Sequence, residues 1–469
     1  MPLNTRATYG RHKTAVLTAL LASFALSACS NMFPIETPSR NMPFGTPLTL
    51  EEDLRKSQNA WWLSFQDPIL NDLVDRGLAE NLTLQQALER VNAAEALVRR
   101  SGSVIDGDGE IGVERIGRKN FSNSTDGRGS IGISWLIDIF GSARFEREAA
   151  EANLKSVEAQ SQAARIVFLS EITQSYIDLR FFEANLARAK EDVESRRRTL
   201  NETQFLVDAG EVTLLELTRA QALLDTAKVE IPVFEARAQT QRNRISTLLG
   251  VPAGTLNFAG PIGQPVPRIT PSGSIPADIV RTRPDVLSAE FDYQADLARL
   301  GVAKTQIYPS LRLNGNIEAG ALDSVNFTRW SFGPTLVIPV FNQGVLKANI
   351  DVADSSAKES YLFWREAVLN AVEEVETALY SVDKSSAAVA AAQNLVRTDT
   401  RSLELLQELV AAKGITVLEV IEIERRVSQG RALLISNLRQ LSLDYVALNA
   451  ALGAGYAVPS RLAGGGTGQ

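Results

Sequence analysis

The chain has 469 residues, of which 45% are hydrophobic and 22% charged, and this composition excludes a mostly disordered protein. It contains one histidine, His12, and one cysteine, Cys29. We therefore expect no zinc enzyme, cysteine hydrolase or histidine-based acid–base catalyst, and no disulfide within the chain. The net charge of -7 argues against a general nucleic-acid binder. We predict no catalytic residues, no cofactor and no metal site, and length alone suggests about two or three domains.

The N-terminal segment, residues 1–28, has the layout of a secretory signal. It carries Arg6, Arg11 and Lys13 and then an apolar run that is too short for a stable membrane anchor. It ends in Leu-Ser-Ala before Cys29, which resembles the lipobox of bacterial lipoproteins. The resemblance implies cleavage before Cys29, acylation of that cysteine, and sorting to the outer membrane. The alternative is an ordinary signal followed by a chance cysteine. Residues 29–60 are proline-rich in their first part and are expected to run extended.

The rest of the chain consists of two similar halves. Three segments of the first half match three segments of the second half, in the same order and at offsets of 201 to 203 residues: GISWLIDIF with GPTLVIPVF, LVDAGEVTLLE with LVAAKGITVLE, and LTLQQA with PDVLSA. Three matches in the same order at nearly the same offset are improbable by chance, so an internal repeat is indicated. We place the first repeat at residues 61–250, a linker at 251–276, the second repeat at 277–455 and a flexible tail at 456–469.

Each repeat contains one very long predicted helix, because residues 142–209 and 345–413 hold no glycine or proline. Apolar residues recur there at every seventh position, which is typical of a coiled-coil seam. These positions are Ile172, Leu179, Leu186, Val193, Leu200 and Val207 in the first helix, and Val375, Val382, Val389, Val396, Leu403 and Val410 in the second. Each helix would be about 100 Å long. An ordinary helix bundle is the alternative, but ordinary helices average about 11–12 residues.

A turn with a glycine, Gly210 or Gly414, follows each long helix, and a return helix is predicted at about 215–250 and 418–453. Each repeat is therefore expected to contain a helical hairpin. Thr213 and Thr416 are suitable N-caps for the return helices, with a glutamate three residues later as the capping-box partner.

Four segments before the long helices alternate apolar with polar or small residues, at about 109–117, 129–138, 311–319 and 329–338. This alternation is the weak signature of membrane-spanning strands, although two soluble hairpins packed on the helices would read alike. A bacterial outer-membrane barrel needs at least about eight strands, because an open edge in lipid leaves backbone groups unsatisfied. Four strands can therefore close only by oligomerising.

Several motifs resemble the TolC-type outer-membrane factors, in particular the efflux lipoproteins of the OprM/NodT kind. They cover about residues 60–455 and read Trp62-x-x-Phe65-x-Asp67-x-x-Leu70, Asn81-x-x-Leu84-x-x-Ala87, Trp135-x-x-Asp138-x-Phe140-Gly141, Arg283-Pro284-Asp285-x-x-x-Ala289-Glu290, Tyr308-Pro309-x-Leu311 and Pro339-x-Phe341. One departure is the first strand, which lacks the proline expected at its start, so where that strand begins is left open.

The resemblance implies a mostly α protein with a small β part, in which three copies form a homotrimer with a 12-stranded barrel in the outer membrane and a helical barrel in the periplasm. It also implies passive conduction of substrate that an inner-membrane transporter, of the RND type, and a periplasmic adaptor deliver to the trimer. Outer-membrane lipid is the remaining partner, and no nucleic acid is expected.

By the same resemblance, the adaptor docks at the hairpin tips, which are Gly210, Glu211, Val212, Thr213, Gly414, Ile415 and Thr416. Glu422 and Glu419 are candidates for an acidic gate, with Asp208 a weaker one; the alternative is that these are capping or solvated side chains. Two other functions compete with the duct. A coiled-coil spacer between envelope layers would have no pore, and a carboxylate-based glycosidase would need a carboxylate pair that nothing in the sequence specifies.

Overall fold

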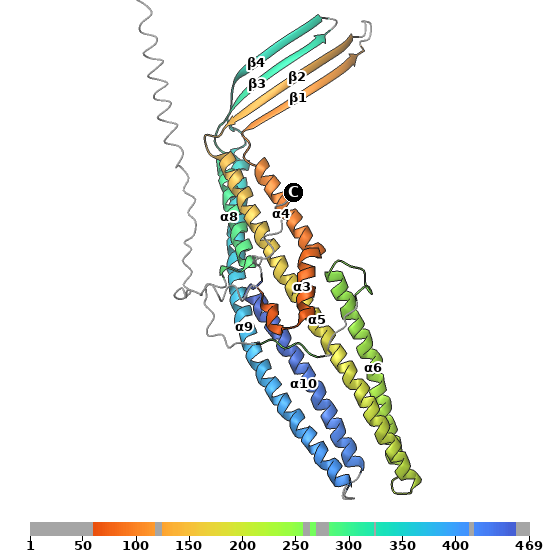
Figure 1. Cartoon of the computed structure of the whole chain (residues 1–469). Helices are drawn as coiled ribbons and strands as arrows, with labels where there is room; N and C mark the ends of the chain where they lie inside the picture. Colours follow the sequence, from red (N-terminus) through yellow and green to blue (C-terminus); the bar gives the residue numbers. More distant parts are fainter. Residues whose placement is uncertain are drawn as a thin grey trace, which may run out of the picture. The chain divides into compact units, whose positions relative to one another are not determined.

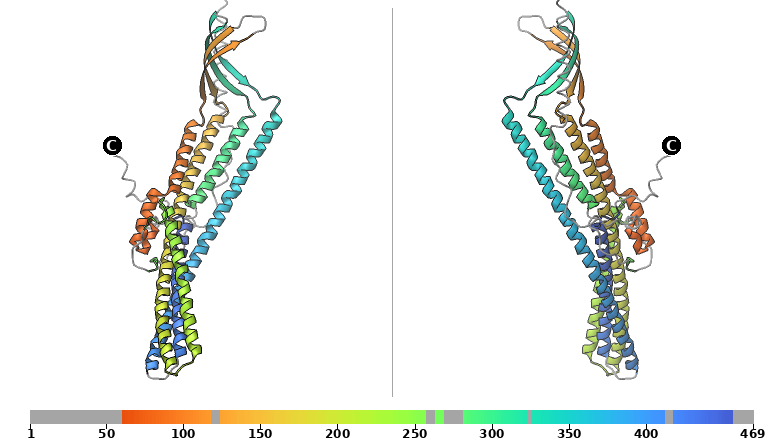
Figure 2. Two further views of the ribbon diagram at one scale, coloured as in Figure 1. Left: turned by 90° about the vertical axis from the view of Figure 1, so that its right-hand side faces the viewer. Right: turned by 90° about the vertical axis from the view of Figure 1, so that its left-hand side faces the viewer.

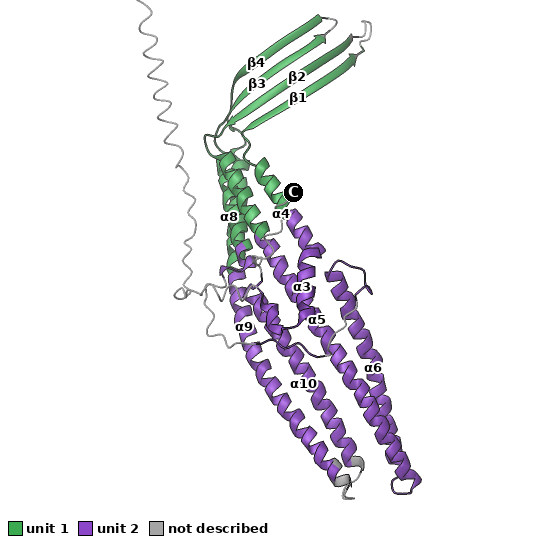
Figure 3. Ribbon diagram, viewed as in Figure 1, with its two compact units in different colours: residues 1–43, 91–158, 288–365 green, residues 44–90, 159–287, 366–469 purple. Residues whose placement is uncertain are grey.

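The computed structural model describes residues 60–117, 124–256, 263–268, 281–322, 325–411 and 417–455. The predicted lipidation site, Cys29, and the second tip, Gly414 to Thr416, lie outside these ranges. The described residues form a small sheet and several long helices (Figure 1). They divide into two compact units (Figure 3), of which unit 1 contains Val91–Glu158 and Ser288–Arg365 and unit 2 contains the other described residues. Of the helices in these ranges, none combines the length and hydropathy needed to cross a membrane.

The sheet of unit 1 is antiparallel throughout, with its strands in the order β1-β2-β3-β4. Its members are β1 (Ile105–Ile116), β2 (Ser124–Ile137), β3 (Ser310–Leu322) and β4 (Val325–Val337). Three of the strands begin four or five residues earlier than the alternation predicted. The first half of β1 reads Ile-Asp-Gly-Asp-Gly, and such residues have low strand propensity, so pairing with β2 rather than local preference makes this stretch extended.

The helical part of unit 1 comes from segments of α4 (Leu82–Arg100), α5 (Ser142–Asp208), α8 (Pro284–Thr305) and α9 (Gln343–Ala411). α5 approaches α8 closely at Gly301, where a side-chain Cβ would lie only 2.7 Å from the ring of Phe145. α8 packs on α9 through Tyr293, whose ring stacks on that of Trp364. Aromatic and small residues therefore set the helix spacing beneath the sheet.

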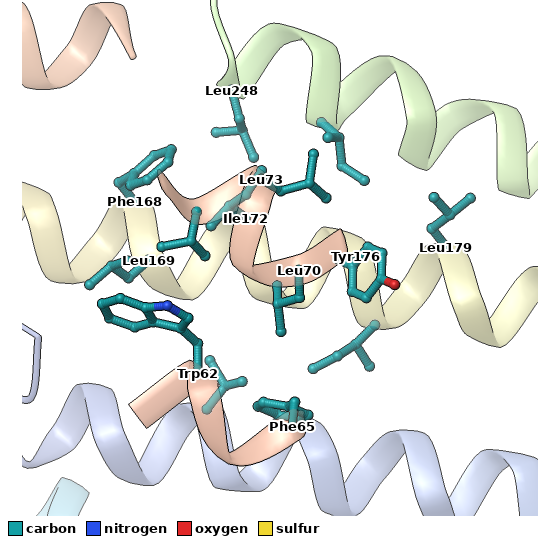
Figure 4. Close-up of a cluster of buried hydrophobic side chains, with 14 of the residues drawn as sticks. Trp62, Phe65, Leu70, Leu73, Phe168, Leu169, Ile172, Tyr176, Leu179 and Leu248 are labelled. Carbon is teal, nitrogen blue, oxygen red and sulfur yellow. The ribbon is translucent and has the colours of Figure 1, made fainter. Parts of the chain in front are cut away.

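Unit 2 has a core in which η2 (Trp61–Phe65) and α3 (Pro68–Glu80) pack against the middle of α5 (Figure 4). Asp67 caps α3 by accepting hydrogen bonds from the backbone of Ile69 and Leu70, and it also accepts one from the Tyr176 hydroxyl at 2.6 Å. Leu70 is fully buried. The Trp-x-x-Phe-x-Asp-x-x-Leu motif is therefore a packing and capping element, with Trp62 and Phe65 buried in the same core.

Two helical hairpins complete unit 2 (Figure 2): α5 with α6 (Leu214–Leu248), and α9 with α10 (Val417–Ala451). Heptad positions of the long helices form the apolar contacts inside each hairpin, as predicted. Val193 packs with Leu224 and Ala227 in the first hairpin. Val375, Val382 and Val389 pack with Leu441 and Leu448 in the second. The two-fold repeat of long hairpins with four strands is thus the observed fold.

Candidate functional site

The first hairpin tip, Gly210 to Thr213, is a tight and exposed turn. Gly210 has a φ of 74°, a left-handed conformation that favours glycine, and its N–H donates to the Val207 carbonyl at 2.9 Å. Thr213 precedes α6 and donates to the Glu216 carboxylate through both its N–H (2.6 Å) and its hydroxyl (3.0 Å). The N–H bond is the main cause of a lowered pKa at Glu216. The predicted capping interaction therefore fixes the shape of this tip.

The three candidate gate residues occupy two different helix ends. Glu419 and Glu422 lie three residues apart near the start of α10, so they share a helix face, and both are exposed. Arg425 donates two hydrogen bonds to Glu422, at 2.5 and 3.1 Å, and thereby holds the pKa of Glu422 below its usual value. Asp208 ends α5 and accepts a hydrogen bond from Gln204 of its own helix. The structure thus groups the two glutamates and leaves Asp208 with a local partner.

A polar seam, which we did not predict, connects α5 with residues 424–439 of α10 inside unit 2. Ser428 donates to Asp192 at 2.5 Å and accepts from Arg188 at 3.0 Å. Arg188 also binds Asp192 (2.6 Å) and Glu230 of α6 (2.7 Å). At the far end of the seam, Arg439 donates to Asp178 at 2.6 Å. These residues link the two hairpins, and therefore the two repeats, through charges and hydroxyls.

Glu424 is a half-buried carboxylate of the polar seam. The hydroxyls of Ser195 and Thr199 each donate to it at 3.3 Å. Burial raises the pKa of Glu424, and the two hydroxyls oppose that effect in part. Glu424 lines a charged groove of about 940 Å³ between α5 and α10, together with Arg198, Arg431 and others. The sequence signal for this seam is the four-residue spacing of Glu424 and Ser428, which puts both on one face of α10, a spacing that a solvated helix face shares.

Arg283 of the Arg-Pro-Asp motif is buried and has a structural role. It donates to Asp285 at 2.7 and 3.0 Å, to Glu374 of α9 at 2.6 Å, and to the Ala451 carbonyl at the end of α10 at 2.7 Å. One side chain therefore ties the start of α8 to both helices of the second hairpin. The Arg-Pro-Asp motif therefore holds three helices together.

The sheet has two chemically different faces, which the strand register assigns. One face is apolar and exposed, and it carries Ile105, Ile111, Ile131, Ile133, Trp135, Ile317, Trp330, Phe332 and Leu336. The opposite face is polar: Ser134 donates to Asn314 at 2.8 Å, and Asn314 donates to Thr335 at 3.0 Å. Large apolar side chains that point away from the protein's own core indicate a surface made for lipid or for a partner.

Comparison with known proteins identifies the chain. The sequence model of the family described as outer membrane efflux protein matches residues 73–251 and 276–454, once for each repeat. The chain belongs to this family. Its location is the outer membrane and its role is efflux, so the family, the duplication and the general function expected from the sequence are confirmed.

Two curated relatives and one solved structure show how far the similarity extends. Nodulation protein T of Rhizobium leguminosarum bv. trifolii is 35% identical over 411 residues, which cover 85% of this chain and 88% of the relative. The cation efflux system protein CusC of Escherichia coli K12 is 24% identical over 92% of this chain and 98% of its own. The structure of the outer-membrane channel OprN matches with a TM-score of 0.78, covering 89% of this chain and 99% of that one at 24% identity, which supports the fold.

Proposed function

We propose that three copies of this protein form the outer-membrane channel of a tripartite efflux system. Substrate would pass through it without chemical change, delivered by an inner-membrane transporter of the RND type and a periplasmic adaptor. Relatives whose names describe efflux or export, such as CusC, OpmQ and SepC, support this role. A duct of this kind needs no catalytic residue or cofactor.

The observation that carries the proposal is that the sheet has two open edges and two chemically different faces. In the described chain β1 and β4 are edge strands, and one face of the sheet is apolar while the other is polar. In lipid, an open edge leaves backbone groups without hydrogen-bond partners. Pairing β4 of one copy with β1 of the next would satisfy both edges, and three copies would give a barrel of 12 strands. The apolar face would then contact lipid and the polar face would line the pore.

The helical hairpins of unit 2 would form the periplasmic tunnel of the same trimer. The adaptor would dock on the tips, Gly210 to Thr213 and Gly414 to Thr416. The left-handed backbone of Gly210 and the Thr213–Glu216 capping interaction fix the shape of the first tip. A relative described as a probable outer membrane lipoprotein, SilC, supports acylation at Cys29.

Glu422 and Glu419 remain our candidates for a gate at the periplasmic end, with Asp208 the weaker one. A ring of three like charges repels unless cations or basic groups offset it. In this protein Arg425 pairs with Glu422, so part of that repulsion is offset inside each copy. The gate would therefore depend on the Arg425 partner as well as on the carboxylates.

Purification in detergent with the native signal, followed by a mass measurement and by conductance in planar bilayers, tests the proposal. We expect a trimer of acylated chains that conducts ions. Cys29→Ser should lose the acyl mass and keep the conductance. Glu422→Ala should change cation block and leak. A soluble monomer without conductance would contradict the duct, and unchanged block and leak in Glu422→Ala would contradict the gate assignment alone.

A further inference from the structure

Charge is unequally divided between the two faces of the sheet. The described strands hold ten charged residues, and the register places nine of them on the polar face; Arg115 is the exception. The nine are the carboxylates Asp106, Asp108, Glu110, Glu114, Asp126 and Glu318 and the bases Arg128, Arg312 and Arg329. Six negative and three positive charges leave this face with a net charge of -3 in each copy. The excess comes from β1.

Asp106, Asp108 and Glu110 form an acidic line on alternate residues of β1. Their register partners on β2 are Ser134, Gly132 and Ser130, which are small and uncharged. Asp108 lies across Gly132, because a Cβ at that glycine would be 2.8 Å from the Asp108 carboxylate. By contrast, Glu318 of β3 is bound by Arg329 of β4 at 2.6 and 2.8 Å, so that pair contributes no net charge. With that pair set aside, the face holds five carboxylates and two arginines, and three of the five carboxylates form the acidic line.

We infer that the acidic line of Asp106, Asp108 and Glu110 makes the lumen of this channel prefer cations to anions. The inference rests on the proposed function, since it requires the sheet to close with its polar face inward. Each position would then recur three times around the pore. Fixed charges of one sign between walls of low dielectric constant raise the local concentration of the opposite ion. The effect comes from the field along the lumen, so no ion needs to be bound there.

The cation preference produced by the acidic line should depend on the salt concentration. Alternate residues of a strand lie about 7 Å apart, so the three carboxylates act on one stretch of the pore. The Debye length is about 10 Å at 0.1 M salt and about 3 Å at 1 M. The preference should therefore be strong at low salt and weak at high salt. Anionic cargo would meet a barrier in this stretch that neutral and cationic cargo would not.

Reversal potentials in asymmetric KCl test the inference on the full-length acylated protein in planar bilayers. We expect the wild type to prefer K⁺ over Cl⁻. The triple variant D106N/D108N/E110Q should lower that permeability ratio by about tenfold at low salt, and each single variant should account for part of the fall. The single variants also keep the test valid if the triple variant fails to assemble.

Two controls separate the acidic line from other charges. E318Q/R329Q removes one charge of each sign from the same face, so the ratio should stay at the wild-type value. E419Q/E422Q removes the candidate gate charges; it should change block and leak, and K⁺ should still be preferred over Cl⁻ because the acidic line is intact. A conducting triple variant with unchanged selectivity, or a preference that disappears only in E419Q/E422Q, would overturn the inference and leave the proposed channel intact. A wild-type protein that does not conduct would instead contradict the proposed function.

Discussion

Two kinds of helix contact meet in unit 2, and they differ in chemistry. Inside each hairpin, apolar residues such as Val193 with Leu224, or Val382 with Leu441, make the contact. Between the hairpins, the polar seam of Arg188, Ser428 and Glu424 adds a contact of charges and hydroxyls beside the apolar core that Val446 of α10 shares with α5. When two helices separate, the whole favourable free energy of burying their apolar surface is lost. Polar groups that separate can form hydrogen bonds to water instead, so the net loss of free energy is small. The hairpins should therefore stay intact under conditions that loosen the polar seam.

The largest effect should come from the apolar side of this comparison. Leu441→Ala removes a buried side chain from the contact of α10 with α9 and should lower the free energy of unfolding by about 2–5 kcal/mol. Denaturant unfolding followed by circular dichroism measures it. Leu441→Met keeps the volume and should cost less than about 1.5 kcal/mol. Equal losses in the two variants would mean that packing at Leu441 does not hold the hairpin.

A smaller effect is expected when the polar seam is cut. Ser428→Ala removes hydrogen bonds to Asp192 and Arg188 but leaves those two residues paired with each other, so the loss should be about 1–2 kcal/mol. Hydrogen exchange should become faster in residues 424–439 of α10 and stay unchanged around Val382 of α9. Ser436→Ala, at an exposed serine of the same helix, is the matched control. If Ser428→Ala destabilises the protein as much as Leu441→Ala, the two contacts do not differ in strength.

The smallest effect should be a pH dependence at Glu424. Burial raises its pKa above the ordinary value of 4.5, with Glu202 adding to the rise and Arg196 opposing it. The seam therefore favours the protonated form, and this contribution is fully present below pH 4.5 and is lost as the pH rises through the raised pKa. Glu424→Gln should remove that dependence and gain up to about 1 kcal/mol at neutral pH.

The exposed Glu422 supplies a contrast of opposite sign. Arg425 lowers the pKa of Glu422, so its contribution is present above the ordinary pKa and is lost as the pH falls through the lowered one. Midpoints of denaturant unfolding between about pH 3 and pH 8 measure both variants, Glu424→Gln and Glu422→Gln. If the unfolding midpoints of the wild type and of Glu424→Gln change with pH in the same way, then the ionisation of Glu424 does not affect the stability of the seam.

The same contrast explains what could be predicted from the sequence. The apolar contacts follow from heptad spacing, because a residue such as Val382 is buried wherever the helix finds a partner. The long helices, the hairpins and the repeat were therefore predictable. The capping of α6 by Thr213 and Glu216 was predictable too, since it involves residues only three positions apart.

The polar seam was not predictable in this way. Ser428 and Glu424 have the same helical spacing as residues on a solvated face, and their partners lie more than 200 residues away. The early start of β1 was missed for a similar reason, because its Asp-Gly sequence becomes a strand only by pairing with β2. The acidic line on β1 follows from that pairing as well. These features depend on which segments of the chain pack against each other, and a single sequence does not reveal such long-range pairings.

The order of the strands bears on how the molecule is made. β1 and β2 are close in the chain, and so are β3 and β4, but the central pairing joins β2 to β3 across about 180 residues, as the Ser134–Asn314 contact shows. A pairing of such long range must overcome the entropy of closing the intervening loop before it gains any contact. The β1–β2 hairpin can fold as soon as it is synthesised, whereas the four-stranded sheet cannot form until the second repeat has been synthesised. A chain interrupted before residue 310 would therefore expose a two-stranded ribbon with an apolar face, and such a ribbon is a target for aggregation or for a chaperone.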